Sequence, residues 1–497
     1  MHFYLYLIYL WIDFYVLVME KDIIGRKREV RLLKQYVASD RSEFIALYGR
    51  RRIGKTYLIM QLFEGKFAFR MTGIENIRRR DQLVNFRLAM SNYVPDAELC
   101  SNWLEAFKQL SDYLENLDVK KKIIFIDEIP WLDSNNSGFF SALENFWNNW
   151  AYYRKDIKLI VCGSATTWML NKLINGVGGL YNRLTHNMLL ETFSLAECKE
   201  FFDKKHLGYD AAEIIEAYMV FGGVPFYLNK LDVQLSVAQN VDNLLFARGA
   251  ELRNEFTRIM SSLYKHSENH VKVMEALSKK NKGLTRREIT DATKLPSNGV
   301  LTKILAELEM CGFVRQYNPF GRVKRDTIYQ LVDPFCLFHF NFVVHRNNNQ
   351  NFWTDIHGKP EYNTWCGYAW EILCLNHIDE IKSALGVRNV VSDICSWYFR
   401  VGESSKACSG TQIDLIIDRD DNVINVCEMK YSLDKYEISK SYDEHSRQSL
   451  EVFRAQTKTK KTLKLTYITP VGLVNNPYSR RVPNSLVFKD IISNSTK

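Results

Sequence analysis

Phe44-Ile-Ala-Leu-Tyr48 is a short apolar run, and Gly49-Arg50-Arg51-Arg52-Ile53-Gly54-Lys55-Thr56 follows it directly. A short apolar run that stops at a glycine is typical of a buried parallel strand. The glycines let the loop curl so that its N–H groups point at phosphate oxygens, while Lys55 reaches the β and γ phosphates and Thr56 offers a hydroxyl to Mg²⁺. A helical pattern begins after the loop, and the positive end of that helix favours the same anion. The stretch therefore predicts a strand, a phosphate-binding loop and a helix.

A second apolar run ends in two carboxylates. Ile123-Ile-Phe-Ile126 is followed by Asp127 and Glu128. A bound Mg²⁺–nucleotide needs a carboxylate at the end of a neighbouring strand, and we expect Asp127 to orient the ion through its water shell. Glu128 is placed to polarise the attacking water, which distinguishes a hydrolase from a protein that only binds nucleotide. The pair predicts hydrolysis of the bound nucleotide.

A third apolar run, Leu159-Ile-Val-Cys162, ends at Gly163. Because helical patterns separate the three runs, the sequence predicts a parallel sheet with helices on its faces. Ser164 has two interpretations, a sensor of the γ-phosphate or the N-cap of a helix. Arg183 is interpreted either as a contact to the γ-phosphate, in the same chain or in a neighbouring subunit, or as an ordinary surface ion pair.

Six short motifs carry a resemblance to a known family. They are Ile24-Gly-Arg26, Tyr48–Thr56, Phe125-Ile-Asp-Glu-Ile-Pro-Trp131, Cys162-Gly-Ser-Ala165, Asn182-Arg183 and Phe221-Gly-Gly-Val-Pro-Phe-Tyr-Leu228. With these motifs, residues from about 22 to 262 resemble the archaeal-type ATPases, a branch of the P-loop ATPases related to the AAA+ and signalling-NTPase groups. The resemblance implies an α/β core that binds ATP and Mg²⁺, followed by a small helical lid. It leaves open what the hydrolysis of ATP acts on.

Helical segments follow the core. Ser194-Leu-Ala-Glu197 is a capping box, and helical patterns continue to about Leu263 with a break at residues 222–225. We therefore expect the ATPase core at residues 20–193 and the helical lid at residues 194–265.

Residues 266–335 have the pattern of a winged helix. His270–Lys280 is expected as its first helix, Thr285-Arg-Arg-Glu288 as the capping box of the second, and Ser297 as the cap of the third. Two strands, joined by a basic wing, complete the pattern. In the DNA-binding version the third helix enters the major groove and the wing touches phosphates. Because the third helix carries only Lys303 as a cation, contact with DNA and a purely spacing role both remain open.

A pair of strands is expected at residues 411–417 and 423–431. If the turn between them is centred near Asp421, the numbers of facing residues sum to about 842, and Asp414 faces Glu428. Lys430 then lies on the same face as Glu428, because alternate residues of a strand share a face.

These side chains and Glu371, on a helical segment, suit a divalent metal, Mg²⁺ or Mn²⁺, and a scissile phosphate. The pattern of Asp414 with Glu428-Met-Lys430 resembles the restriction-endonuclease-like nucleases, and the region from Asp333 onward resembles a C-terminal domain often fused to archaeal-type ATPases. The resemblance implies an α/β nuclease-like domain at residues 336–497. Three interpretations stay open: a working metal nuclease, a degraded nuclease fold used only for binding, and a polar hairpin with a surface ion pair.

The whole chain has an ordinary globular composition. Its 497 residues are 46% apolar and 25% charged, which excludes disordered, collagen-like and low-complexity classes. The net charge is +9, with the basic excess concentrated in residues 270–330 and 435–497. Such runs have two interpretations, a face for polyanion partners and, more commonly, a solvated charged surface. No pair of its ten cysteines is spaced as C-x-x-C, so we expect a reducing cytoplasm and no structural zinc.

Residues 1–19 are unusually apolar. Only this stretch approaches membrane-spanning length, and Asp13 in its middle would cost about 3 kcal/mol on insertion. It lacks the basic region and cleavage site of a secretory signal. Three interpretations remain, a translation start at Met19, a membrane anchor, and a segment that lies on the protein; the first is favoured, so no membrane is expected.

The sequence as a whole predicts an α/β protein with a parallel-sheet P-loop ATPase core, a helical lid, a winged helix and an α/β nuclease-like domain. ATP and Mg²⁺ are the expected cofactors, with a second Mg²⁺ or Mn²⁺ in the last domain, and DNA is the expected partner of a chain that is compatible with a homo-oligomer. The leading hypothesis is an ATP-regulated enzyme that acts on DNA. The rival is a switch in which ATP and ADP rearrange the lid and winged helix to bind a partner, without strand cleavage.

Overall fold

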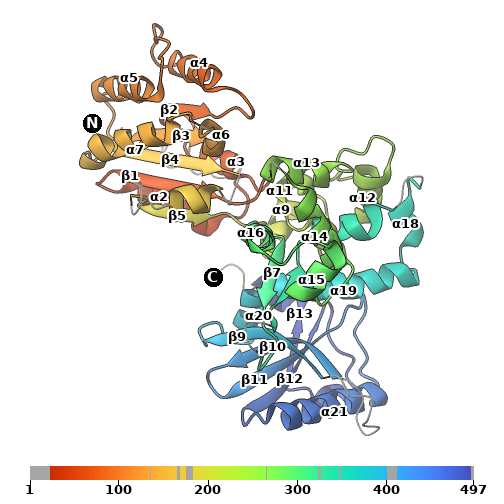
Figure 1. Cartoon of the computed structure of the whole chain (residues 1–497). Coiled ribbons are helices and arrows are strands. Elements are labelled where there is room, and N and C mark those ends of the chain that lie inside the picture. The colour runs from red at the N-terminus through yellow and green to blue at the C-terminus, as the bar shows by residue number, and fades with distance from the viewer. Residues whose placement is uncertain are drawn as a thin grey trace, which may run out of the picture. The chain divides into compact units, whose positions relative to one another are not determined.

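The computed structural model describes residues 23–134, 136–164, 168–174, 183–264, 266–322, 326–345, 349–399 and 411–493. The chain divides into two compact units, residues 1–192 and 193–497, whose elements are labelled in Figure 1. The apolar leader at residues 1–19, Ala165 and Asn182 lie outside the described residues. No helix within the described ranges is both long and apolar enough to cross a membrane.

The first unit is built on one parallel sheet. Its five strands have the order β2-β3-β4-β1-β5, and every neighbouring pair is parallel. They are β1 (Glu43–Tyr48), β2 (Phe67–Thr72), β3 (Lys122–Asp127), β4 (Ile157–Gly163) and β5 (His186–Leu189). The central strands β3 and β4 are buried along their whole length, as expected when both faces of a sheet are covered. The predicted parallel α/β core is confirmed.

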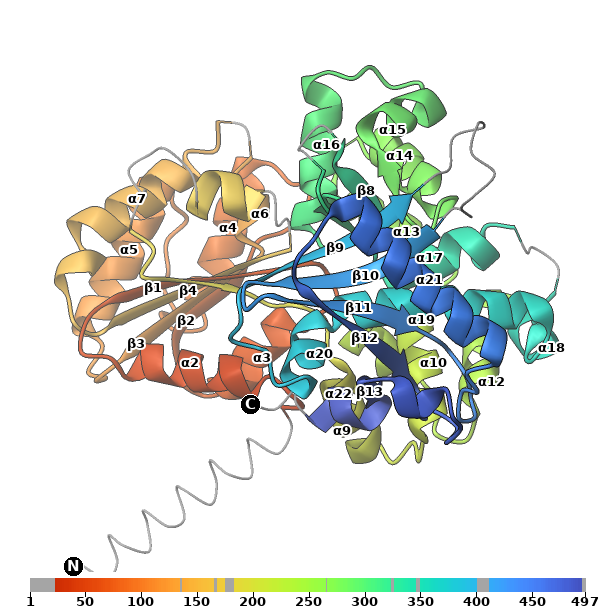
Figure 2. The ribbon, with the colours of Figure 1, turned by 90° about the horizontal axis from the view of Figure 1, so that it is seen from below.

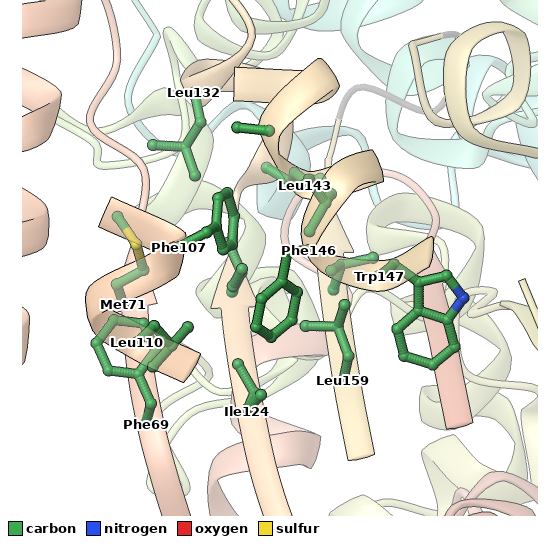
Figure 3. Packing of buried hydrophobic residues seen from close by; sticks show 14 of the residues in the cluster. Phe69, Met71, Phe107, Leu110, Ile124, Leu132, Leu143, Phe146, Trp147 and Leu159 are labelled. Atoms are coloured by element: carbon green, nitrogen blue, oxygen red, sulfur yellow. The ribbon is translucent and has the colours of Figure 1, made fainter. Parts of the chain in front are cut away.

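Helices cover both faces of this sheet. They are α2 (Lys27–Ala38), α3 (Lys55–Leu62), α4 (Arg79–Met90), α5 (Trp103–Asn116), α6 (Ile129–Leu132) and α7 (Phe139–Asn149), with the short helices η2 (Ala151–Tyr153) and η3 (Met169–Ile174). Successive residues of β1 alternate between two cores, one shared with α5 and α7 and the other with α2 and α3. Figure 3 shows the first core, where Phe107 and Phe146 pack against Ile124 and Leu159 of the strands. This packing holds the carboxyl ends of β1, β3 and β4 side by side.

The second unit begins with helices. They are α9 (Leu195–Lys204), α10 (Ala211–Phe221), α11 (Pro225–Leu228), α12 (Val237–Val241), η4 (Asp242–Phe246) and α13 (Glu255–Leu263). The predicted capping box is confirmed, since Ser194 accepts from the N–H of Glu197 and the Glu197 side chain accepts from that of Ser194. The predicted break is also present, because Gly222 ends α10 in the left-handed conformation with φ 65° and Pro225 starts α11.

A small sheet with three helices follows. The helices are α14 (Glu268–Ser278), α15 (Arg286–Thr293) and α16 (Gly299–Met310), and the strands β6 (Leu284–Thr285), β7 (Val314–Tyr317) and β8 (Ile328–Leu331) pair in the order β6-β8-β7. The capping box of Thr285 and Glu288 is confirmed. The prediction that Ser297 caps the third helix is wrong: Asn298, an equally good capping residue, accepts from the N–H of Val300. Ser297 instead accepts a hydrogen bond from Nε of Arg286 at 2.9 Å.

The rest of the second unit contains a mixed sheet and further helices. Its strands β9 (Ser392–Phe399), β10 (Thr411–Arg419), β11 (Val423–Met429), β12 (Thr462–Thr469) and β13 (Asn484–Val487) have the order β13-β12-β11-β10-β9. The helices are α17 (Pro334–Phe338), η6 (His339–Val343), α18 (Phe352–Ile356), α19 (Pro360–Asn376), α20 (Ile378–Ala384), α21 (Lys440–Thr457), η7 (Ser479–Arg481) and α22 (Phe488–Ser493). Figure 2 shows α21 running along the sheet, where its Phe453 packs into the core of β9, β10 and β11.

The pairing of β10 with β11 has the predicted register. Leu415 faces Cys427 and Asp418 faces Ile424, so the numbers of facing residues sum to 842. The observed pairing ends at Leu415 with Cys427, and one further position of the same register would place Asp414 opposite Glu428. Toward β9 the register of β10 shifts between residues 413 and 416, so Asp414 lies in an irregular segment of its strand.

Candidate functional site

Two glycines shape the phosphate loop. Gly49 has φ +142°, and a Cβ on it would lie 2.2 Å from the carbonyl oxygen of Leu190, so only glycine fits there. Gly54 is left-handed, with φ +87°, and directly precedes α3. The predicted order of strand, loop and helix is confirmed, because the chain passes from β1 through this loop into α3.

Lys55 is buried inside the loop that it closes. Its ammonium donates to the carbonyl oxygens of Gly49 and Arg50, both at 2.9 Å. Burial lowers the pKa of Lys55, and the charges of Glu128 and Asp127 act in the opposite direction. A nucleotide phosphate is a stronger partner for an ammonium than a carbonyl oxygen, so the lysine is poised to exchange one for the other.

Arg26 supports the loop from outside the glycine motif. Its guanidinium donates to the carbonyl oxygen of Ile53 at 3.3 Å and to that of Glu191 at 2.6 Å. Arg26 therefore ties the loop to the chain that leaves β5. The sequence indicated no role for Arg26 beyond its place in Ile24-Gly-Arg26.

Thr56 and Asp127 come together from the loop and from the end of β3. The hydroxyl of Thr56 donates to Oδ2 of Asp127 at 2.7 Å. The other carboxylate oxygen, Oδ1, accepts from the N–H of Glu128 at 3.0 Å. Burial raises the pKa of Asp127, and the hydrogen bond from Thr56 acts against this shift. The pair presents a hydroxyl and a carboxylate, both oxygen donors of the kind that Mg²⁺ binds.

Glu128 is held by Ser164 at the end of the neighbouring strand. The backbone N–H and the hydroxyl of Ser164 donate to Oε2 of Glu128 at 3.1 and 2.8 Å. Glu128 has φ 45° and precedes α6, so the backbone leaves the extended conformation of β3 at this residue. The structure thus brings Ser164 and Glu128 into contact with each other and places both beside Asp127.

Arg183 lies at the amino ends of the strands, whereas the phosphate loop lies at their carboxyl ends. It precedes β5, whose first residue, His186, pairs in parallel with Ile45 near the start of β1. Its guanidinium lies over the ring of Tyr152, 5.2 Å from the ring centroid, and Tyr152 also precedes a strand, β4. The six residues of β1, at about 3.3 Å each, separate the amino ends of the strands from the phosphate loop by about 20 Å. This position does not favour a γ-phosphate contact within the same chain, so a contact in a neighbouring subunit and an ordinary surface role are the two interpretations of Arg183 that stay open.

A second group of charged side chains lies in the second unit. Asp414 of β10 forms an ion pair with Lys282, whose ammonium is also 3.6 Å from Oε2 of Glu371 on α19. Gln412 donates to the same carboxylate oxygen of Asp414 at 2.9 Å. Lys282 belongs to the turn between α14 and β6, and no sequence motif pointed to it.

Glu428 has its own partners. Lys430 lies 3.2 Å from Oε2 of Glu428, and the hydroxyl of Tyr442 on α21 donates to the same oxygen at 2.6 Å. The ammonium of Lys430 also lies over the ring of Tyr442, 4.9 Å from its centroid. The predicted pair of Glu428 and Lys430 on one face is confirmed, while the role of Tyr442 in orienting the carboxylate was missed.

Glu371 links the two halves of this group electrostatically. Burial, and after it the charge of Asp414, raises the pKa of Glu371 to about 7, whereas Lys282 and Lys430 act in the opposite direction. In the part of the chain that the structure describes, no group of three or more His, Cys, Asp or Glu side chains is spaced to hold a metal ion. Asp414 and Glu428 are instead each paired with a lysine.

Comparisons with known proteins agree with the geometry of the first unit. Residues 23–231 match a family described as an ATPase domain predominantly from Archaea. The uncharacterized protein MJECL04 of Methanocaldococcus jannaschii is 26% identical over 433 residues, which make up 86% of this chain and 91% of that protein. The family match and the loop geometry together support a P-loop ATPase domain.

Similar solved structures cover about two thirds of the chain. The Walker-type ATPase PABY2304 of Pyrococcus abyssi is 19% identical with a TM-score of 0.47, and the similarity covers 65% of this chain and 97% of that one. The ORC2 protein of Aeropyrum pernix, solved in ADPNP–ADP complexes, is 14% identical with a TM-score of 0.39, and the similarity covers 66% of this chain and 97% of that one.

Proposed function

We propose that this chain is a Mg²⁺-dependent ATPase whose nucleotide cycle controls the action of the second unit on DNA. The hydrogen bond between Thr56 and Asp127 carries the ATPase part, since it puts a hydroxyl and a carboxylate side by side at the phosphate loop. Those two groups hold Mg²⁺ beside nucleotide phosphates in P-loop enzymes. The match of residues 23–231 to an ATPase domain supports the same assignment.

Each residue of the site has one task in this mechanism. Lys55 and the loop N–H groups neutralise and orient the β and γ phosphates. Thr56 and Asp127 would hold Mg²⁺, which when bound neutralises charge on the phosphate oxygens. Glu128 accepts a hydrogen bond from the attacking water and directs it at the γ-phosphate. Ser164 fixes the direction of the Glu128 carboxylate.

Steady-state ATP hydrolysis, with Mg²⁺ and with EDTA, tests the ATPase proposal. Asp127→Asn should lower kcat at least about 100-fold, because the ion loses the charged group that orients it. Asp112→Asn is the matched control, since Asp112 is half exposed on α5 and pairs only locally with Lys108. Full activity of Asp127→Asn, or equal rates with Mg²⁺ and with EDTA, would contradict the proposal.

The small sheet of the second unit supports the DNA part. Its helices and strands follow one another in the order of a winged helix, in which α16 would face the major groove. Arg287 on α15 and Lys303 on α16 have side chains that are 92% and 73% exposed. We expect these cations to contact phosphates, so replacing both with alanine should weaken duplex binding and reduce its dependence on salt. Fluorescence anisotropy of a labelled duplex at two salt concentrations measures both effects.

One observation favours the rival, a nucleotide-operated switch that cleaves nothing. Asp414 and Glu428 are each paired with a lysine, and Lys303 of α16 pairs with Glu307 on its own helix at 3.8 Å. A nuclease assay with Mg²⁺ or Mn²⁺, with and without ATP, separates the two functions. Cleavage that Asp414→Asn abolishes supports DNA processing. No cleavage, together with a DNA affinity that differs between ATP and ADP, supports the switch.

A further inference from the structure

Lys282 occupies the place where the second unit was expected to hold a metal ion. Its ammonium contacts Oδ1 of Asp414 and lies 3.6 Å from Oε2 of Glu371. The carboxylates come from β10 and α19, whereas the lysine comes from the turn after α14. The side chains of Lys282, Glu371 and Asp414 are 38%, 24% and 30% exposed, so solvent screens their charges only in part.

The backbone that presents Lys282 is held in place. The carbonyl oxygen of Lys282 accepts from the hydroxyl of Tyr317 at 2.9 Å, and that of Asn281 accepts from the hydroxyl of Tyr368 at 3.4 Å. Gly283 has φ +83°, and a Cβ there would lie 2.3 Å from a carbonyl oxygen of β8. The turn therefore follows one path, and it aims Lys282 at the two carboxylates.

The neighbouring lysines behave differently. Lys279 pairs with Glu275 one turn away on its own helix at 2.8 Å, and Lys280 pairs with Glu288 at 2.6 Å. Lys282 instead bridges to a residue 132 positions away in the sequence. A local pair such as that of Lys279 contributes little to stability, and it makes Lys279 a suitable control for the charge of this segment.

We propose that Lys282 is a tethered cation that blocks the binding of a divalent metal ion to Asp414 and Glu371. An ammonium between two carboxylates satisfies the same electrostatic demand as a metal ion, and its charge repels a second cation a few ångströms away. The inference rests on the DNA-processing form of the proposed function, in which the second unit would use a metal ion, and adds the step that this requires, the withdrawal of Lys282. A phosphate of bound DNA is a partner that competes with carboxylates for an ammonium.

A Mn²⁺ titration of the full-length protein without nucleotide tests the proposal by isothermal titration calorimetry. Lys282→Met keeps the length of the side chain and removes its charge, so it should bind Mn²⁺ at least about tenfold more tightly than the wild type, which is about 1.4 kcal/mol. Lys282→Arg and Lys279→Met should behave like the wild type. Adding Asp414→Asn to Lys282→Met should remove the gain, which assigns it to this cluster.

Equal Mn²⁺ affinity in the wild type and in Lys282→Met would overturn the proposal. If both proteins bind and Asp414→Asn abolishes binding, the metal site stands and only the blocking role of Lys282 fails. If neither binds, the metal site fails as well, while ATP hydrolysis by the same samples reports separately on the first unit. Circular dichroism verifies folding, and Lys282→Gln replaces Lys282→Met if the latter does not fold.

Discussion

Ser164 donates two hydrogen bonds to one carboxylate oxygen of Glu128, from its backbone N–H at 3.1 Å and from its hydroxyl at 2.8 Å. The two residues follow β4 and β3, which are adjacent and parallel. Glu128 has φ 45°, a conformation that residues other than glycine seldom adopt. Such a backbone persists only where its surroundings fix it, and here the strand end and Ser164 do so. The direction of the proposed catalytic carboxylate is therefore set by two strands together.

Ser164→Ala should lower kcat about tenfold with little change in KM. A hydrogen bond to a charged group contributes about 1.5–3 kcal/mol, and Glu128 acts on water and not on nucleotide binding. Ser164→Thr keeps the hydroxyl and should retain most of the activity. Steady-state kinetics with ATP measure both variants, and a raised kcat in Ser164→Ala would mean that the serine restrains Glu128 instead of orienting it.

Lys55→Ala should weaken ATP binding at least about 100-fold, because the phosphates lose the buried cation that neutralises them. The matched control is Lys66→Ala, which removes an exposed lysine beyond the end of α3. Binding of a fluorescent ATP analogue in the presence of Mg²⁺ compares the two. Equal affinity in Lys55→Ala and in the control would contradict the assignment of the phosphate loop.

Glu128→Gln should keep ATP bound while slowing hydrolysis about 100-fold or more. Glutamine has the shape of glutamate and can still accept the hydrogen bonds from Ser164, but it is a poor proton acceptor for the water. Equilibrium binding together with a single-turnover assay separates binding from chemistry. A fully active Glu128→Gln would show that another group orients the water.

The phosphate loop could be predicted because its determinants are local. An apolar strand, two glycines and a helix start follow one another, and the structure has them in that order at Gly49 and Gly54. The meeting of Thr56 with Asp127 followed from the same pattern, since parallel strands bring their carboxyl ends to one edge of a sheet. The register of β10 against β11 was predictable from the single turn that joins them.

Other features depend on contacts that no local pattern encodes. Arg183 lies at the amino ends of the strands because β5 pairs in parallel with β1, and no local pattern predicts that pairing. The pairing of Lys282 with Asp414 brings together two segments whose own sequences predict only a turn and a strand. Ser297 and Asn298 are both good capping residues, so the sequence alone does not decide which of them caps α16. In the structure Asn298 is the cap, and Ser297 accepts a hydrogen bond from Arg286.

Gly49→Ala should destabilise the first unit by about 2–4 kcal/mol, the range of a substitution that forces a strained backbone and a clash. An added Cβ would lie 2.2 Å from the carbonyl oxygen of Leu190, which is a backbone atom and not the end of a flexible side chain. Gly65→Ala is the matched control, since Gly65 also has positive φ, +70°, but nothing lies within 4 Å of its Cβ position. Thermal unfolding should show a clearly larger loss for Gly49→Ala than for Gly65→Ala, and equal losses would contradict the structure of the loop.

Glu371 should make the stability of the second unit depend on pH. Burial and the charge of Asp414 raise the pKa of Glu371 from its ordinary value of 4.5 to about 7 in the folded state, against the opposing charges of Lys282 and Lys430. Below pH 4.5 the carboxyl is protonated in both states, so it contributes no difference. Between pH 4.5 and 7 only the unfolded chain releases the proton, so the folded state loses stability as the pH rises, and the loss levels off above 7.

Glu371→Gln removes this dependence. The Tm of Glu371→Gln minus that of the wild type should therefore increase from about pH 5 to pH 7 and stay constant above it, in buffers without divalent ions. Asp379→Asn, which changes an exposed carboxylate on the following helix α20, is the control and should show no such trend. A difference in Tm that stays flat across this range would contradict the raised pKa of Glu371 in the folded state.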